Sequence, residues 1–85
     1  MKITVRFFAS VKEQLGRDVE ELELPASVST VGGLRSHLRS RGGAWAEVLA
    51  DSKRITAALN QDMVKPAAAI KPGDEVAFFP PVTGG

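Results

Sequence analysis

The sequence predicts a single small α+β domain, in which a mixed sheet carries one main helix packed on one face. Three observations support this fold class. Segments that alternate apolar and polar residues, typical of half-buried strands, occur towards both ends of the chain. One segment in the middle has its apolar residues at helical spacing instead. The length of 85 residues allows one domain with a modest core and no deep cofactor cavity.

The first part of the chain predicts two strands that pair as a hairpin and are linked by a short helix. Residues 2–8 alternate between apolar and polar side chains, which indicates the first strand. Residues 9–15 favour a helix, and Gly16 is typical of the position just after a helix C-terminus. Residues 19–24 alternate again and predict the second strand, which Pro25 ends.

The main helix is predicted to begin after Thr30, whose hydroxyl group can cap a helix N-terminus. The apolar residues that follow at helical spacing are Val31, Leu34 and Leu38. Gly42-Gly43 predicts the end of this helix, and residues 45–49 suggest one further helical turn. Gly32-Gly33 should weaken the first turn of the main helix by about 1 kcal/mol per glycine.

Three short strands complete the predicted sheet. The expected order is a strand over residues 55–59, a turn over residues 60–62, a return strand over residues 63–64 and a last strand over residues 75–79. Lys71-Pro72-Gly73-Asp74 indicates the turn before the last strand, and Pro80-Pro81 cannot continue a hydrogen-bonded ladder. This order is the ubiquitin-like β-grasp arrangement. We therefore expect a β-grasp domain over residues 1–79 and an extended, flexible tail over residues 80–85.

Charge and composition argue against several classes of function. With 11 Lys and Arg against 10 Asp and Glu, the chain has a net charge of +1 and lacks the basic stripe that a nucleic-acid-binding protein needs. It has no cysteine and one histidine, which argues against a disulfide, a metal site or a Cys nucleophile. No apolar run approaches the roughly 18 residues of a membrane span. We expect a cytoplasmic protein that binds no nucleic acid, membrane, metal or cofactor.

The side chains offer no convincing active site. His37 has no cysteine or second histidine to join it, and the serines have no other base, so a hydrolase triad is not expected. Glu20, Glu21 and Glu23 are expected to form the solvated face of the second strand. The chain is therefore expected to supply no catalytic side chain.

The segment after the last predicted strand suggests a different chemistry. It consists of Pro80, Pro81, Val82, Thr83, Gly84 and Gly85. The prolines stiffen its base, and in extended form it would reach about 18–20 Å, at roughly 3.1–3.3 Å per residue. Glycines without side chains can thread a narrow channel in another protein. The carboxylate of Gly85 could then attack the α-phosphate of ATP, and sulfur or an amine could attack the resulting acyl-adenylate.

Several segments of the sequence resemble the MoaD family, the small subunits of molybdopterin synthase. The most specific is residues 73–85, and the others are Phe7-Phe8-Ala9, Leu15-Gly16 and Leu59-Asn60-Gln61. The resemblance covers essentially the whole chain. The related thiamine-pathway sulfur carrier also ends in Gly-Gly but usually lacks the Phe-Phe-Pro-Pro run. Gly32-Gly33 departs from the family, whose members carry better helix formers there.

The resemblance implies a sulfur carrier. The carboxylate of Gly85 would be adenylated by an E1-like enzyme that uses ATP, and the glycyl adenylate would become a thiocarboxylate, a 1-thioglycine. Within a heterotetramer, the tail would enter the large subunit of molybdopterin synthase and donate sulfur to cyclic pyranopterin monophosphate, forming the molybdopterin dithiolene. The chain would be a sulfur-donating subunit with no active site of its own. The alternatives are a carrier for another pathway, such as thiamine or a tungsten-type pterin, a ubiquitin-like conjugation tag, or an interaction module.

Strand alternation also predicts a partner-binding surface. It places Phe7 and Phe78 towards the core and Phe8 and Phe79 on the opposite face. If the first and last strands are neighbours, the outward aromatic side chains lie close together where the tail leaves the sheet, and Met63 can join them from the short strand. Aromatic residues grouped in this way are typical of an interface core. We expect Phe8, Met63 and Phe79 to bind the partner.

Overall fold

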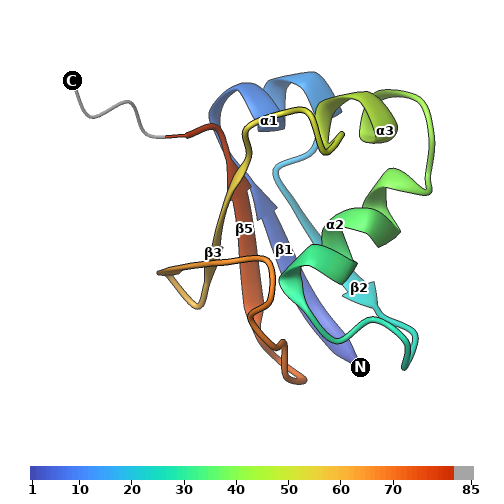
Figure 1. The fold of residues 1–85 in the computed structure, drawn as a ribbon, viewed down its shortest axis with the longest axis vertical. Coiled ribbons are helices and arrows are strands. Elements are labelled where there is room, and N and C mark those ends of the chain that lie inside the picture. Colours follow the sequence, from blue (N-terminus) through green and yellow to red (C-terminus); the bar gives the residue numbers. More distant parts are fainter. Residues whose placement is uncertain (82–85) are drawn as a thin grey trace.

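A computed structural model describes residues 1–81 of the chain (Figure 1). In chain order its elements are β1 (Lys2–Phe7), α1 (Ala9–Leu15), β2 (Val19–Glu23), α2 (Val31–Arg39), α3 (Ala44–Val48), β3 (Thr56–Leu59), β4 (Asp62–Val64) and β5 (Glu75–Phe79). The strands form one sheet in the order β2-β1-β5-β3-β4, in which β1 and β5 are parallel and the other pairs antiparallel. The predicted fold class, a mixed sheet with a main helix on one face, is confirmed.

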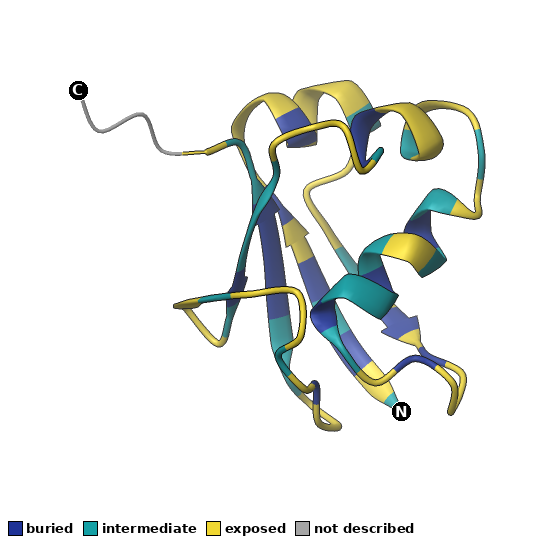
Figure 2. Ribbon diagram, in the orientation of Figure 1, coloured by how far each residue is buried: buried dark blue, intermediate teal, exposed yellow. Residues whose placement is uncertain are grey.

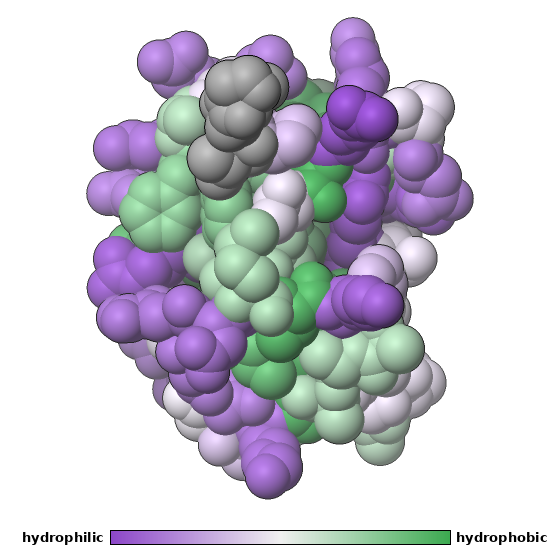
Figure 3. Space-filling view, turned by 60° about the vertical axis from the view of Figure 1, so that its left-hand side comes forward, coloured by the Kyte–Doolittle hydropathy of each residue, from purple (hydrophilic) through white to green (hydrophobic). Residues whose placement is uncertain are grey.

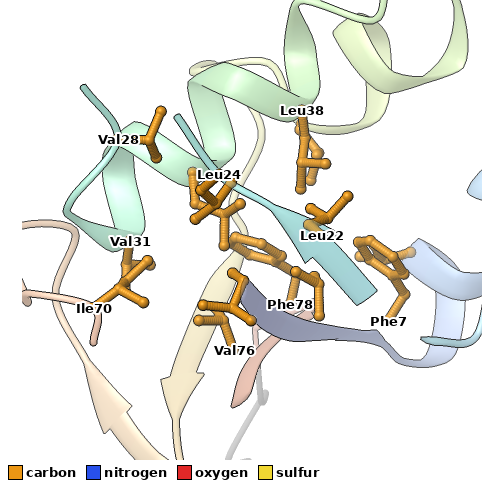
Figure 4. Packing of buried hydrophobic residues seen from close by; sticks show 14 of the residues in the cluster. Phe7, Leu22, Leu24, Val28, Val31, Leu38, Ile70, Val76 and Phe78 are labelled. Atoms are coloured by element: carbon orange, nitrogen blue, oxygen red, sulfur yellow. The ribbon is translucent and has the colours of Figure 1, made fainter. Parts of the chain in front are cut away.

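The core lies between the sheet and the helical layer. Figure 1 shows α2 crossing the sheet, while α1 and α3 lie together at the end where β1 finishes. Phe7 of β1 and Phe78 of β5 are 0% and 1% exposed, and their rings stack with centroids 6.4 Å apart. Figure 4 shows Leu38 of α2 and Leu22 of β2 packed over these rings. Apart from Ala58 and Ala77, the buried residues coloured in Figure 2 line this interior, which is the side predicted by the alternation of the strands.

The start of α2 confirms one prediction and adds a reason for its glycines. The hydroxyl oxygen of Thr30 accepts a hydrogen bond from the backbone N–H of Gly33, at 3.0 Å, as expected for an N-cap. The N–H of Gly32 donates to the carbonyl oxygen of Pro66, at 2.8 Å. A Cβ at Gly32 would lie 3.2 Å from Pro66, so glycine permits the close approach of two segments. The Gly32 departure is therefore a packing feature as well as a weakness in the helix.

The end of α2 differs from its prediction. The helix stops at Arg39, before the expected Gly42-Gly43. Those glycines have positive φ, of 78° and 55°, in the turn that leads into α3. The prediction placed the boundary too late because the glycines end the connecting turn and not the helix itself.

One acidic residue of β2 also differs from its prediction. Glu20 lies on the helix-covered face of the sheet, and its side chain is only 17% exposed. Arg41 donates hydrogen bonds of 3.0 and 2.6 Å to the two carboxylate oxygens and lies over the ring of Trp45, 4.5 Å from its centroid. Glu21 and Glu23 are exposed, as expected. Glu20 therefore does not belong to the solvated face and instead joins β2 to the segment after α2.

This ion pair predicts how stability depends on pH. The hydrogen bonds from Arg41 hold the pKa of Glu20 below its usual value of 4.5. A carboxyl group with a depressed folded-state pKa stabilises the fold above its unfolded pKa, and this contribution is lost as pH falls through the folded value. We expect Glu20→Gln to be less stable near neutral pH and to lose less stability between about pH 5 and pH 3. Urea unfolding of both proteins across this pH range tests the expectation.

Arg35 of α2 fixes the loop between α3 and β3. Its Nε donates to the carbonyl oxygen of Leu49 at 2.8 Å, and a terminal nitrogen donates to those of Ala50 and Lys53 at 2.5 and 2.9 Å. Partial burial lowers the pKa of Arg35 from its ordinary value. One cation thus satisfies three carbonyl groups of a segment that has no regular structure.

Removal of this guanidinium should destabilise the fold. We expect Arg35→Met to lower the free energy of unfolding by about 2 kcal/mol, because hydrogen bonds from a charged group contribute more than neutral ones. The matched variant is Arg39→Met, which removes an ion pair with the exposed carboxylate of Asp51 and should cost less than about 1 kcal/mol. Urea denaturation of both variants measures the difference. Equal losses would contradict the role assigned to Arg35.

Candidate functional site

The candidate site lies on the face of the sheet opposite the helices. The strand register places one residue from each of four neighbouring strands in a row across this face: Arg6 of β1, Ala77 of β5, Ala58 of β3 and Met63 of β4. The three helices of residues 1–81 pack on the other side of the sheet. The row is therefore available to a partner.

The three predicted partner-binding residues, Phe8, Met63 and Phe79, meet at one hollow of about 520 Å³ on this face. Phe8 and Met63 are 44% and 63% exposed, and Phe79 is half-buried. The N–H of Phe8 donates to the carbonyl oxygen of Phe78, at 3.1 Å, which sets the end of β1 beside the end of β5. Figure 3, turned towards the β3 side of the molecule, shows a band of apolar side chains bordered on both sides by hydrophilic ones.

The centre of the hollow consists of two alanines that were not predicted as site residues, although strand alternation puts Ala77 on this face. Ala58 and Ala77 are direct register partners on β3 and β5, and both line the hollow. They are 7% and 9% exposed, since the larger side chains around them rise above their methyl groups. The only signal in the sequence was alanine, which is depleted in strands, at the middle of two predicted strands.

The hollow has a polar border beside its apolar wall. Nε of Arg6 donates to Oε2 of Glu75 at 2.8 Å, and this hydrogen bond is the main cause that raises the pKa of Arg6. The guanidinium, like that of any arginine, is charged at physiological pH. Its two terminal nitrogens make no hydrogen bond within residues 1–81, so they remain free to donate to a partner.

A tight turn positions Met63 and Glu75 relative to each other. Asn60 and Gln61, between β3 and β4, both have positive φ, at 50° and 73°. The Asn60 side chain accepts from the N–H of Glu75 at 2.9 Å and donates to Asp74 at 3.0 Å. The hydrogen bond from Asn60 to Asp74, followed by one from the backbone N–H of Lys71 at 2.7 Å, lowers the pKa of Asp74. The turn thus ties the β3–β4 hairpin to the start of β5.

The predicted tail begins at the edge of this hollow. β5 ends at Phe79, and Pro80 and Pro81 follow directly, half-buried and exposed respectively. Val82, Thr83, Gly84 and Gly85 lie outside the described residues. None of the helices in residues 1–81 has the length and apolar character to cross a bilayer. In the same part of the chain, no group of three or more His, Asp or Glu side chains is arranged to hold a metal ion.

Comparison with known proteins relates this fold and site to one family. A model described as the ThiS family matches residues 5–85 of the chain. The chain is 47% identical over 83 residues to the molybdopterin synthase sulfur carrier subunit of Escherichia coli (strain K12), a match that covers 98% of this chain and 99% of that protein.

Solved structures support the same relationship. One is the small archaeal modifier protein 1 of H. volcanii, with a TM-score of 0.76 and 26% identity, over 95% of this chain and 98% of that one. Another comes from a complex of subunits 1 and 2 of the molybdopterin-converting factor of Helicobacter pylori 26695, with a TM-score of 0.68 and 26% identity, over 100% of both chains. The ubiquitin-like β-grasp fold and the resemblance to MoaD are confirmed, and the chain belongs to the ThiS family.

Proposed function

We propose that this chain is the sulfur carrier subunit of molybdopterin synthase and that the carboxylate of Gly85 carries the sulfur. The observation that carries the proposal is the placement of the two aromatic residues that open the Phe-Phe-Pro-Pro-Val-Thr-Gly-Gly segment. Its first aromatic residue, Phe78, is locked in the core, and its second, Phe79, lines an apolar hollow at the point where the tail begins. The segment therefore leaves the sheet beside the apolar hollow, which would set the proposed tail next to the proposed docking surface. The division into a domain over residues 1–79 and a tail over residues 80–85 is part of this proposal.

The proposed chemistry takes place on the tail and on its partners. An oxygen of the Gly85 carboxylate attacks the α-phosphorus of ATP in an E1-like enzyme, and pyrophosphate leaves. A sulfur nucleophile at the oxidation level of sulfide then attacks the carbonyl carbon of the adenylate, and AMP leaves, so that the glycine keeps one oxygen and one sulfur as a thiocarboxylate. The tail enters the large subunit and transfers this sulfur to cyclic pyranopterin monophosphate. The domain contributes reach and positioning, which can account for large rate effects without a catalytic side chain.

The proposed partner is the large subunit of molybdopterin synthase, in a heterotetramer. The similar Helicobacter pylori chain was solved in a complex of subunits 1 and 2, which supports such a partner here. Phe8, Met63 and Phe79 would form the apolar centre of the interface, and Arg6 and Glu75 its polar border. The chain itself would hold no cofactor, and ATP would bind to the activating enzyme in the cytoplasm.

Intact-mass measurement of the chain purified from its own cells tests the proposal. We expect a fraction in which one oxygen has been exchanged for sulfur. Mixed with the large subunit and cyclic pyranopterin monophosphate, this fraction should lose its sulfur and yield dithiolene. Because each chain carries one sulfur and a dithiolene contains two, two chains in the thiocarboxylate form should be consumed for each dithiolene formed. A ratio of one to one, or the absence of any thiocarboxylate, would contradict the proposal.

The similarity to a small archaeal modifier protein supports a second candidate, a protein-conjugation tag. Both functions share the adenylation step and differ in the next nucleophile. If lysine amines accept the glycyl group, the chain should be found in isopeptide-linked adducts. Adducts without a detectable thiocarboxylate would favour the tag over the sulfur carrier.

A further inference from the structure

We propose that the hollow on the open face is a receptor for one bulky apolar side chain of the large subunit, and that Ala58 and Ala77 set its depth. This inference rests on the proposed function. It goes further by naming what enters the hollow and which residues select it. The apolar rim alone would make a general contact surface, whereas a recessed centre favours a partner with a projecting side chain.

The recess exists because two small residues face each other at the middle of the sheet. Ala58 and Ala77 are register partners, and Met63 is paired with Ala58 on the next strand. β-branched and aromatic residues are the usual occupants of such central strand positions, and alanine is depleted there. A valine in place of either alanine would fill the centre of the recess and would raise the strand propensity at that position. Residues of low strand propensity at central strand positions are typical of functional sites.

The walls of the recess suit an apolar side chain. Phe8, Met63 and Phe79 line it from three different elements or their ends. Met63 is 63% exposed, and its flexible thioether side chain can adapt to a neighbour. A pocket with apolar walls near the centre of a contact surface is where residues with the largest binding contributions are usually held. The occupant we infer is therefore an aromatic or large aliphatic side chain.

The polar border indicates that the occupant belongs to a polypeptide. The terminal nitrogens of Arg6 make no hydrogen bond within residues 1–81, and a purely apolar cover would bury them without acceptors. A protein segment has backbone carbonyl oxygens directly beside its side chains and can supply both groups at once. Phe79 also connects the hollow to the tail, so a subunit that receives the tail must lie close to this recess.

A size series at Ala77 tests the inference. The variants are Ala77→Ser, Ala77→Val and Ala77→Leu, with Ala58→Val as a second site. The matched control is Ala46→Leu, which adds the same bulk to the exposed surface of α3, in the helical layer. Affinity for the large subunit is measured by calorimetry, and folding stability by urea denaturation. The association state of the free chain is measured by sedimentation.

We expect the dissociation constant to rise with side-chain size, by about tenfold or more for Ala77→Leu, and to stay unchanged for Ala77→Ser and Ala46→Leu. Ala77→Val and Ala58→Val should be at least as stable as the wild type while binding more weakly. Opposite changes in stability and affinity distinguish a recess for a partner from a packing role. If Ala77→Leu does not fold, the two valine variants decide the question.

Unchanged affinity in both valine variants, with a wild type that binds the large subunit, would overturn the receptor and leave the proposed function standing. A wild type that does not bind the large subunit would overturn the proposed function as well. Self-association of the wild type that Ala77→Leu abolishes would show that a second copy fills the recess, which would also overturn the inference.

Discussion

A chain that lacks only Gly85 is expected to lose activation by more than about 100-fold while its fold stays intact. The shortened chain still ends in a glycine carboxylate, but that group is withdrawn by about 3.3 Å. A displacement of about 1 Å in a reacting group can already cost on the order of 100-fold. The fold should not change, because the core cluster of the described residues ends with Phe78.

ATP–pyrophosphate exchange with the activating enzyme measures this effect, and urea denaturation checks the fold. Thr83→Ser is a suitable control, since it changes the tail without changing its length and should exchange at nearly the wild-type rate. Full exchange by the shortened chain would show that the reacting group is not the carboxylate of Gly85.

Phe79→Asp is expected to weaken binding of the large subunit by about 2 kcal/mol or more, which is roughly 30-fold. The half-buried ring forms one wall of the hollow beside the start of the tail. In the variant, a carboxylate would have to lose its hydration when the partner covers this face, without an assured hydrogen-bond donor. Folding stability should fall by a smaller amount, because part of the ring is already in contact with water.

Calorimetric titration and urea unfolding separate the two effects. Ala46→Asp is the control, because it places the same charge at an exposed residue of α3, in the helical layer, which does not line the hollow. It should bind within about threefold of the wild type. If Phe79→Asp unfolds the chain while binding per folded molecule is unchanged, the assignment of Phe79 to the interface is wrong.

Local patterns in the sequence predicted most of the elements. Gly16 at a left-handed position, the Thr30 cap and the turn at residues 71–74 each act within a few residues, so their signals can be read from neighbouring positions. Alternation was also sufficient to place Phe7 and Phe78 in the core and Phe8 on the open side.

Features that depend on pairing between distant segments could not be predicted in this way. The hydrogen bonds between Glu20 and Arg41 link residues 21 positions apart, so no local pattern pairs them, although alternation with Leu22 places Glu20 on the helix-covered face. The close contact of Gly32 with Pro66 is of the same kind. Alternation gave the faces of the strands but not their order, so the sequence offered no means of placing Ala58 opposite Ala77.

The position of β5 has a mechanical consequence for the chain. This strand lies between β1 and β3, and the tail continues it directly. A pull on the tail therefore runs along the strand axis and loads the hydrogen bonds to both neighbours in shear, all at once, instead of opening them one by one from an edge. A strand held by two neighbours in this way resists being pulled out of the sheet. Under the proposed function, the domain would then withstand being drawn repeatedly out of a narrow channel of its partner without unravelling.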